Sequence, residues 1–151
     1  MHRIRLAILA ALLLAVPAAP ALAESSAIKV YKSPTCGCCT KWIDHLEANG
    51  FEVSAVDVAD VGPVKQQHGV PAELASCHTA LVDGYVVEGH VPASDLVRLL
   101  REKPDVKGLA VPDMPLGSPG MEASDPSRHE RYEVLSFDAE GRTKVFESHG
   151  P

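Results

Sequence analysis

The spacing of apolar positions over residues 27–50 predicts a strand followed by a helix. Ala27–Tyr31 (AIKVY) has the composition of a short strand. Ser33-Pro34-Thr35 breaks this strand, and Ser33 or Thr35 can cap the helix that follows. Asn49-Gly50 ends the helix. Its buried face is predicted from i, i+3, i+4, i+7 spacing and consists of Cys39, Trp42, Ile43 and Leu46.

Further elements follow in regular order. Phe51–Val58 alternates loosely and predicts a second strand, and Val61–His68 predicts a short helix. Two β-rich runs, Thr79–Val82 and Tyr85–Glu88, flank Asp83-Gly84, which is a strong hairpin signal. Another helix starts at Pro92-Ala93-Ser94 and ends by Pro104, with its buried side formed by Leu96, Val97, Leu99 and Leu100.

This order of elements predicts an α/β fold with a thioredoxin-like core over residues 24–103. The first two strands are joined through a helix, so they should be parallel, and the hairpin adds antiparallel strands. The composition of the chain changes after this core. Gly108–Met121 is rich in Pro and Gly and is predicted to contain no regular element, and Asp125–Arg131 is predicted as a polar linker. The C-terminal extension, residues 104–151, is predicted to end in a β-hairpin formed by Tyr132–Phe137 and Thr143–Glu147.

The first 23 residues have the pattern of a secretory signal peptide. Arg3 and Arg5 form a basic start, Leu6–Val16 is apolar but too short to span a bilayer, and Ala21-Leu22-Ala23 is a small-x-small cleavage site. We therefore expect a mature protein that is exported to the periplasm and is not inserted in the membrane. That compartment is oxidising, so unpaired thiols there need a reason to persist.

Composition and charge narrow the function. The chain has 151 residues, enough for one domain, and a net charge of −6, which becomes −8 without Arg3 and Arg5. An acidic mature protein does not suit nucleic acid or an anionic membrane as a partner. Four cysteines are too few for a disulfide scaffold of this length, and three of them lie within four residues.

Three closely spaced cysteines form the best candidate for a chemically active site. Cys36, Cys38 and Cys39 lie at a strand-to-helix turn, where free N–H groups and the helix dipole favour thiolates. Cys36 and Cys39 alone have the C-x-x-C spacing of dithiol redox enzymes, but Cys38 adds a third thiol that such an enzyme does not need. In a thioredoxin-like fold Cys77 and His78 would face this turn. The sequence therefore predicts a four-sulfur site with an imidazole beside it, suited to a soft ion such as Cu(I) and able to bridge several ions.

Two other interpretations of the cysteines remain. Two structural disulfides fit the count, but neighbouring Cys38 and Cys39 rarely pair and only one of the three can reach Cys77. A structural zinc site fits poorly, because such sites use two C-x2–4-C pairs.

Methionines and histidines supply further candidate ligands. Met114 and Met121 lie in the Pro/Gly-rich segment, where each fills a gap at the edge of the core or ligates Cu(I) through its thioether. His90 borders the site or serves as an ordinary loop residue. The remaining histidines are expected on the solvated surface and are His45, His68, His129 and His149.

Several of these segments together resemble the CopG-type family of exported copper-resistance proteins, which carry a C-x-C-C motif and are also catalogued as a domain of unknown function. Asp113 stands where the family pattern has Gly. The matching pieces span nearly the whole mature chain and are Tyr31–Cys39, Gly69-Val70-Pro71, Ser76–Ala80, Gly84-Tyr85, Glu88–Ala93, Gly108–Pro112, Met114-Pro115 and Gly117–Glu122.

The resemblance implies a thioredoxin-like domain whose C-terminal extension helps to bind metal. It also implies a thiolate-bridged copper site at the C-x-C-C motif and a role in handling or redox-cycling copper during periplasmic detoxification. Catalytic roles then fall on Cys36 and Cys39. The metal ligands would be Cys36, Cys38, Cys39, Cys77, His78, Met114 and Met121.

Three functions fit these residues. The first is a monomeric copper oxidoreductase that interconverts Cu(I) and Cu(II) and uses the thiols as a source of electrons. The second is a carrier or buffer without turnover that receives Cu(I) from periplasmic chaperones or passes it to efflux components. The third is a dithiol–disulfide exchanger acting on proteins, for which Cys36 and Cys39 suffice.

Overall fold

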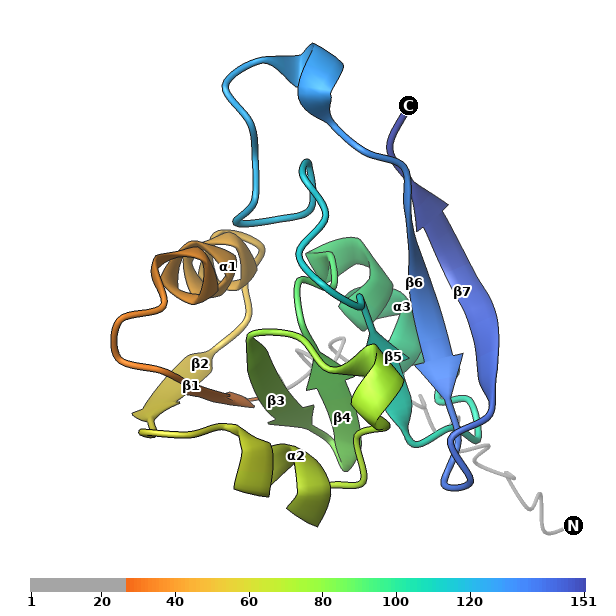
Figure 1. Cartoon of the computed structure of the whole chain (residues 1–151). Coiled ribbons are helices and arrows are strands. Elements are labelled where there is room, and N and C mark those ends of the chain that lie inside the picture. Colours follow the sequence, from red (N-terminus) through yellow and green to blue (C-terminus); the bar gives the residue numbers. More distant parts are fainter. Residues whose placement is uncertain (1–26) are drawn as a thin grey trace, which may run out of the picture.

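The structure is a computed structural model, and it describes residues 27–151; the predicted signal peptide lies outside the described residues. Within these described residues, one mixed sheet of seven strands is flanked by three helices (Figure 1). In chain order the elements are β1 (Ile28–Lys32), α1 (Gly37–Ala48), β2 (Val53–Asp57), α2 (Gly62–Gln67), the 3-10 turn η1 (Ala72–Leu74), β3 (His78–Val82), β4 (Tyr85–Glu88), α3 (Ala93–Glu102), β5 (Gly108–Ala110), the 3-10 turn η2 (Pro126–Arg128), β6 (Tyr132–Phe137) and β7 (Thr143–His149).

The strands pair in the order β2-β1-β3-β4-β5-β6-β7. β1 and β2 are parallel and β3 and β4 are antiparallel, which confirms both pairings expected from the sequence. The β3–β4 turn places Asp83 and Gly84 at φ 47° and 84°, the positive values that an Asp-Gly hairpin turn requires. The α/β class is therefore confirmed.

The two faces of the sheet carry cores of different size. Neighbouring strand residues point to opposite faces, so Val87 and Val86 belong to different cores. The larger core packs α1 and α3 on one face and contains Trp42, Leu46, Leu96 and Leu99, all fully buried. The smaller core lies on the other face, where η1 contributes Leu74 and the sheet contributes Val86, Ala110 and Phe137.

Two local predictions about the helices are wrong. Neither Ser33 nor Thr35 caps α1, because Cys36 occupies the N-cap position and the two hydroxyl groups bond to each other at 3.1 Å. In α3, Val97 is 49% exposed although its neighbours Leu96 and Leu99 are buried. The i, i+3 pair already fills the buried side of this ten-residue helix, so the position between them faces outward.

The C-terminal extension continues the same sheet, which corrects the prediction that Gly108–Met121 lacks a regular element. Gly108–Ala110 forms β5, parallel to β4 and antiparallel to β6. Gly108 permits close backbone approach and does not mark a turn, because a Cβ there would overlap the backbone of Val86. Residues 111–131 then arch past α1 before returning to β6 (Figure 1), and the predicted polar linker holds η2. β6 and β7 pair antiparallel, and β7 runs to His149.

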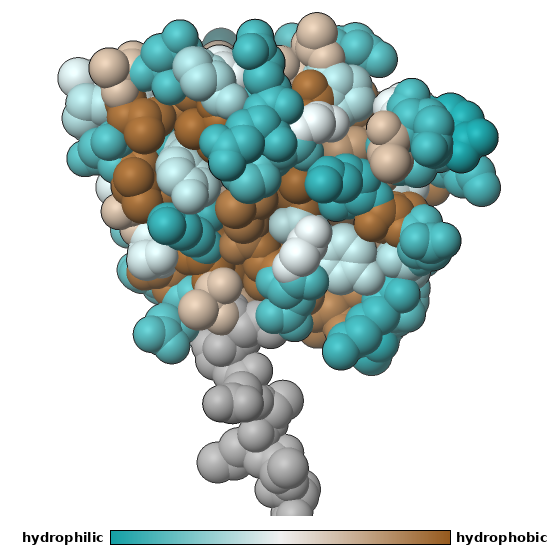
Figure 2. All heavy atoms as spheres, turned by 90° about the horizontal axis from the view of Figure 1, so that it is seen from below, coloured by the Kyte–Doolittle hydropathy of each residue, from teal (hydrophilic) through white to brown (hydrophobic). Residues whose placement is uncertain are grey.

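Contacts between β7 and α3 fix the end of the chain. His149 Nε2 lies 2.7 Å from a carboxylate oxygen of Asp95, and Arg98 donates to the carbonyl of Phe146 at 3.1 Å. The four histidines expected on the solvated surface, which are His45, His68, His129 and His149, are partly buried. On the face seen from below in Figure 2, hydrophobic residues show between hydrophilic side chains. No helix within residues 27–151 has the length and apolarity needed to cross a membrane.

Candidate metal centre

The first turn of α1 and the segment before β3 bring the four cysteines together. Cys38 and Cys39 lie in that turn, Cys36 is its N-cap, and Cys77 immediately precedes β3. The antiparallel pairing of β1 with β3 places the end of β1, and hence the start of α1, beside this segment. All four sulfur atoms lie within 4.8 Å of one another. The structure thus gathers the sulfur atoms that the sequence singled out.

The cysteines are partly oxidised. Cys36 and Cys39 form a disulfide, while Cys38 and Cys77 are free. The Cys38 sulfur lies 3.5 Å from that of Cys36 and 4.0 Å from that of Cys77. The structure therefore does not contain two structural disulfides: it has one C-x-x-C disulfide, and Cys38 and Cys77 remain free thiols.

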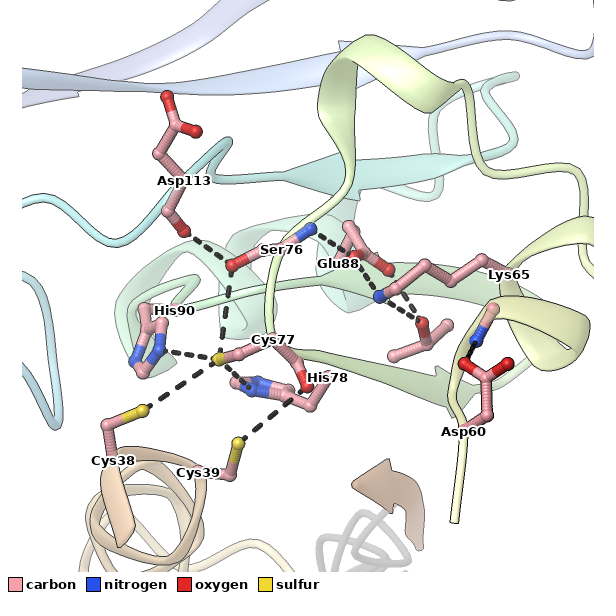
Figure 3. A network of polar contacts seen from close by, with 12 residues as sticks. Cys38, Cys39, Asp60, Lys65, Ser76, Cys77, His78, Glu88, His90 and Asp113 are labelled. Atoms are coloured by element: carbon pink, nitrogen blue, oxygen red, sulfur yellow. Dashed lines mark hydrogen bonds and ion pairs between the residues drawn. The ribbon is translucent and has the colours of Figure 1, made fainter. Parts of the chain in front are cut away.

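Two imidazoles meet the Cys77 sulfur from the other side (Figure 3). His78 Nδ1 lies 3.2 Å from it and His90 Nε2 lies 3.0 Å from it, so these three residues form a second group of potential metal ligands. His90 Nδ1 donates to the carbonyl of Pro119 at 2.8 Å, because a carbonyl can only accept. This bond fixes the tautomer of neutral His90 and leaves the Nε2 lone pair directed at the thiol site.

His78 is buried completely. Its ring packs against Trp42 at a tilt of 39°, with 4.3 Å between centroids, and Trp42 donates from Nε1 to the carbonyl of Val91 at 2.8 Å. The Nε2 atom of His78 has no hydrogen-bond partner among residues 27–151. Burial, and then the nearby His90 and Lys65, hold the pKa of His78 well below its usual range. His78 is therefore a neutral imidazole with its Nδ1 turned to the Cys77 sulfur.

Cys77 is a protonated thiol when no metal is bound. Burial raises its pKa to about 12, and the neighbouring Cys38 adds to this shift. A metal ion would have to displace this proton, so metal binding there should release protons and strengthen with rising pH. Burial also lowers the pKa of His90, which keeps the second imidazole unprotonated as well.

The extension loop reaches the first turn of α1. Gly120 has φ +86°, and a Cβ built there would lie 2.7 Å from the carbonyl oxygen of Cys38 and 2.9 Å from the nitrogen of Trp42. The Gly120 N–H donates to Glu122 at 2.8 Å. Only glycine fits at this close approach, which presses the loop against the thiol-bearing turn.

The two candidate methionines lie in segments that touch this centre. Asp113, next to Met114, has φ +59°, a conformation that suits the glycine of the family pattern, and its carbonyl accepts from the hydroxyl of Ser76. Met114 is 46% exposed and lines an open cleft of about 540 Å³ between residues 111–115 and 130–135. Met121 follows Gly120 and is partly buried. The backbone around each methionine meets the centre, and ligation by their sulfur atoms stays a prediction.

Behind the centre lies a buried ion pair that the sequence did not reveal. Glu88 is fully buried and pairs with the ammonium of Lys65. Burial raises the pKa of the Glu88 carboxyl, and Lys65 offsets part of that shift. A charged residue at the end of a predicted strand gave no sign of burial, because only the tertiary fold places Lys65 beside it.

The comparisons with known proteins agree with this description. The family described as a protein of unknown function, DUF411, matches residues 74–121, which include Cys77, His78 and His90. No curated protein sequence matches the chain. The solved structure of copper resistance protein copG, form 1, is 48% identical and covers 85% of this chain and 100% of its own, with a TM-score of 0.78. Form 2 of that protein is also 48% identical and covers 83% and 99%, with the same TM-score. Since this similarity extends over most of the described fold, the chain belongs to the family of the copper resistance protein CopG.

Proposed function

We propose that the protein acts in copper resistance by binding copper at its cysteines and interconverting Cu(I) and Cu(II). One observation carries this proposal: four cysteine sulfurs lie within 4.8 Å of one another, and the Cys77 sulfur also contacts two imidazole nitrogens. Both similar solved structures are of a copper resistance protein, which supports copper as the metal.

The donor set suits copper in both oxidation states. Thiolates select Cu(I), whereas imidazole nitrogens suit several transition metals, including Cu(II). In the reduced protein Cys36, Cys38, Cys39 and Cys77 would bridge more than one copper ion, and His78 would add a nitrogen. Met114 and Met121 would serve as peripheral ligands from the extension.

The thiols can also exchange electrons with the metal. Oxidation of the Cys36 and Cys39 thiolates to their disulfide releases two electrons, which reduce two Cu(II) ions to two Cu(I) ions. The disulfide form is the one in the structure. A dithiol reductant from outside would return the cysteines to the reduced form, so these two residues would be catalytic.

The proposal includes the organisation of the precursor. Residues 1–23 act as a cleaved signal peptide, residues 24–103 form a thioredoxin-like domain, and residues 104–151 form a metal-site extension that ends in a hairpin. The order of β1, α1, β2, α2, β3, β4 and α3 supports the domain assignment. The mature protein would act as a monomer in the periplasm.

An anaerobic copper titration of the fully reduced protein tests the site. We expect several Cu(I) equivalents per chain, and fewer equivalents with lower affinity for Cys38→Ser, because Cys38 lies between the other sulfurs. Thr40→Ser serves as the control, since it lies on the exposed side of α1, keeps its hydroxyl group and changes no proposed ligand. A Cys38→Ser protein that binds copper like its parent contradicts the clustered site.

A second experiment separates redox turnover from simple carriage. Reduced protein is mixed with Cu(II) without oxygen, and Cu(I) and remaining thiols are counted. One Cu(I) per thiol lost supports redox chemistry, whereas binding without thiol loss supports a carrier that delivers copper to chaperones or efflux components.

The Cys36–Cys39 disulfide also favours a second candidate, dithiol–disulfide exchange with protein substrates. For this activity Cys38 and Cys77 should be dispensable. Reduction of insulin by the metal-free protein would support it, and an inactive metal-free protein would exclude it.

A further inference from the structure

The buried pair of Glu88 and Lys65 lies on the opposite side of the sheet from the thiol centre. β3 pairs with β4 so that Thr79 is opposite Glu88. Successive strand residues point to opposite faces, so Thr79 and Glu88 face α2, whereas His78 faces Trp42 on α1. Glu88 therefore lies behind the centre, where Lys65 of α2 reaches it.

The Glu88 carboxylate accepts hydrogen bonds from residues on both sides of Cys77 (Figure 3). It accepts from the Ser76 N–H at 2.6 Å and from the Thr79 hydroxyl at 2.7 Å, and it pairs with Lys65. Lys65 also donates to the Thr79 hydroxyl at 3.1 Å. Three donors thus meet one carboxylate, and two of them flank the segment that carries Cys77 and His78.

A gain in the free energy of unfolding does not explain why the fold buries this ion pair. Removing two charges from water costs free energy, and well-packed apolar side chains of similar volume are often as stable. What apolar residues cannot do is hold the Ser76 N–H and the Thr79 hydroxyl in fixed directions. A charged acceptor makes each of these hydrogen bonds stronger than a neutral one would.

We propose that Glu88 is a positioning residue of the metal centre: from behind the sheet it fixes the Ser76–Thr79 segment so that Cys77 and His78 face the sulfurs of α1. Lys65 pairs with the carboxylate in its buried position. The inference rests on the proposed copper function for its role, and on the hydrogen bonds above for its geometry. Residues behind the ligands typically change metal affinity by about 10- to 100-fold when they are altered.

The test compares Glu88→Gln with Glu102→Gln, a matched change at an exposed carboxylate of α3. In the metal-free oxidised protein, Cys38 and Cys77 are the two free thiols, so iodoacetamide labels both and peptide mass spectrometry gives each rate. For Glu88→Gln we expect the ratio of Cys77 to Cys38 labelling to rise about tenfold or more, because weakening a hydrogen bond to a charged group opens the segment locally. The control should keep the wild-type ratio.

Copper affinity supplies the second measurement. Competition with a Cu(I) chelator should show Glu88→Gln binding about 10- to 100-fold more weakly than wild type. Thr79→Val, which removes one of the three contacts and leaves the ion pair, should shift both measurements in the same direction by less. It provides the test if Glu88→Gln does not fold.

Two outcomes overturn the inference: a folded variant whose labelling ratio and Cu(I) affinity match wild type, or a rise in Cys38 labelling equal to that of Cys77, which indicates general destabilisation. The labelling needs no copper. A wild-type protein that fails to bind Cu(I) therefore refutes the proposed function without deciding the role of Glu88, which the labelling ratio decides by itself.

Discussion

Replacing Gly120 by alanine should detach the extension loop from the thiol-bearing turn. Gly120 and Gly50 share φ +86°, but their surroundings differ: a Cβ at Gly120 meets the Cys38 carbonyl at 2.7 Å, whereas a Cβ at Gly50 meets nothing within 4 Å. Gly50→Ala therefore measures the backbone strain alone, about 1–2 kcal/mol. Gly120→Ala adds the steric overlap with the backbone of α1, about 1–3 kcal/mol more.

Urea unfolding of the metal-free protein, followed by circular dichroism, gives both free energies. If the loop lifts away instead of straining the whole fold, the global cost is smaller, but the bond from His90 Nδ1 to the Pro119 carbonyl is lost. The nitrogen resonances of His90 then report the change. The reasoning is refuted if Gly120→Ala costs no more than Gly50→Ala and leaves those resonances unchanged.

Three further results are expected. Trp42→Phe leaves the Val91 carbonyl without its donor and opens a cavity beside His78, so unfolding free energy should drop by about 2–4 kcal/mol, and an unchanged urea midpoint would contradict the packing. Burial lowers the pKa of His45 below its ordinary value of 6.5, so the unfolded chain takes up the proton first and stability is lost as pH falls below about 6.5. His45→Gln should flatten this slope in urea titrations from pH 7 to 5, and an equal slope would rule out its contribution. Asp113 has φ +59°, so Asp113→Gly should change stability by less than about 0.5 kcal/mol while Asp113→Val costs about 1–2 kcal/mol, and equal melting temperatures for the two variants would disprove the strain.

Local patterns predict much of the fold. The apolar spacing of α1 places Cys39, Trp42 and Leu46 in the core, where all are fully buried. Asp83-Gly84 locates the hairpin because its backbone needs positive φ at both positions. The prediction for Val97 is wrong because the buried side of α3 is too narrow for all four apolar residues that the spacing assigned to it. The prediction that Gly108–Met121 contains no regular element is wrong at β5, because a glycine in a turn and a glycine under a neighbouring backbone look alike in sequence.

The thiol cluster can be predicted from sequence, but its surroundings cannot. Three cysteines in one turn are visible in sequence, and the fold class brings Cys77 to them. His90 can be placed only near the border of the site, since its bond to Pro119 crosses 29 positions. Glu88 is invisible because a buried charge depends on a distant partner, here Lys65 from α2. Long-range polar contacts of this kind leave no periodic trace.

The loop between β5 and β6 is anchored at both of its ends. Ala110 and Leu135 are direct partners across these strands, so both ends of the loop are tethered within one sheet. The entropy of closing a flexible loop grows slowly, by only about 0.6 kcal/mol for each doubling of length. Extra residues inserted between Asp113 and Pro119 should therefore cost little stability, provided that Pro119 keeps its bond to His90 and Gly120 keeps its place against α1.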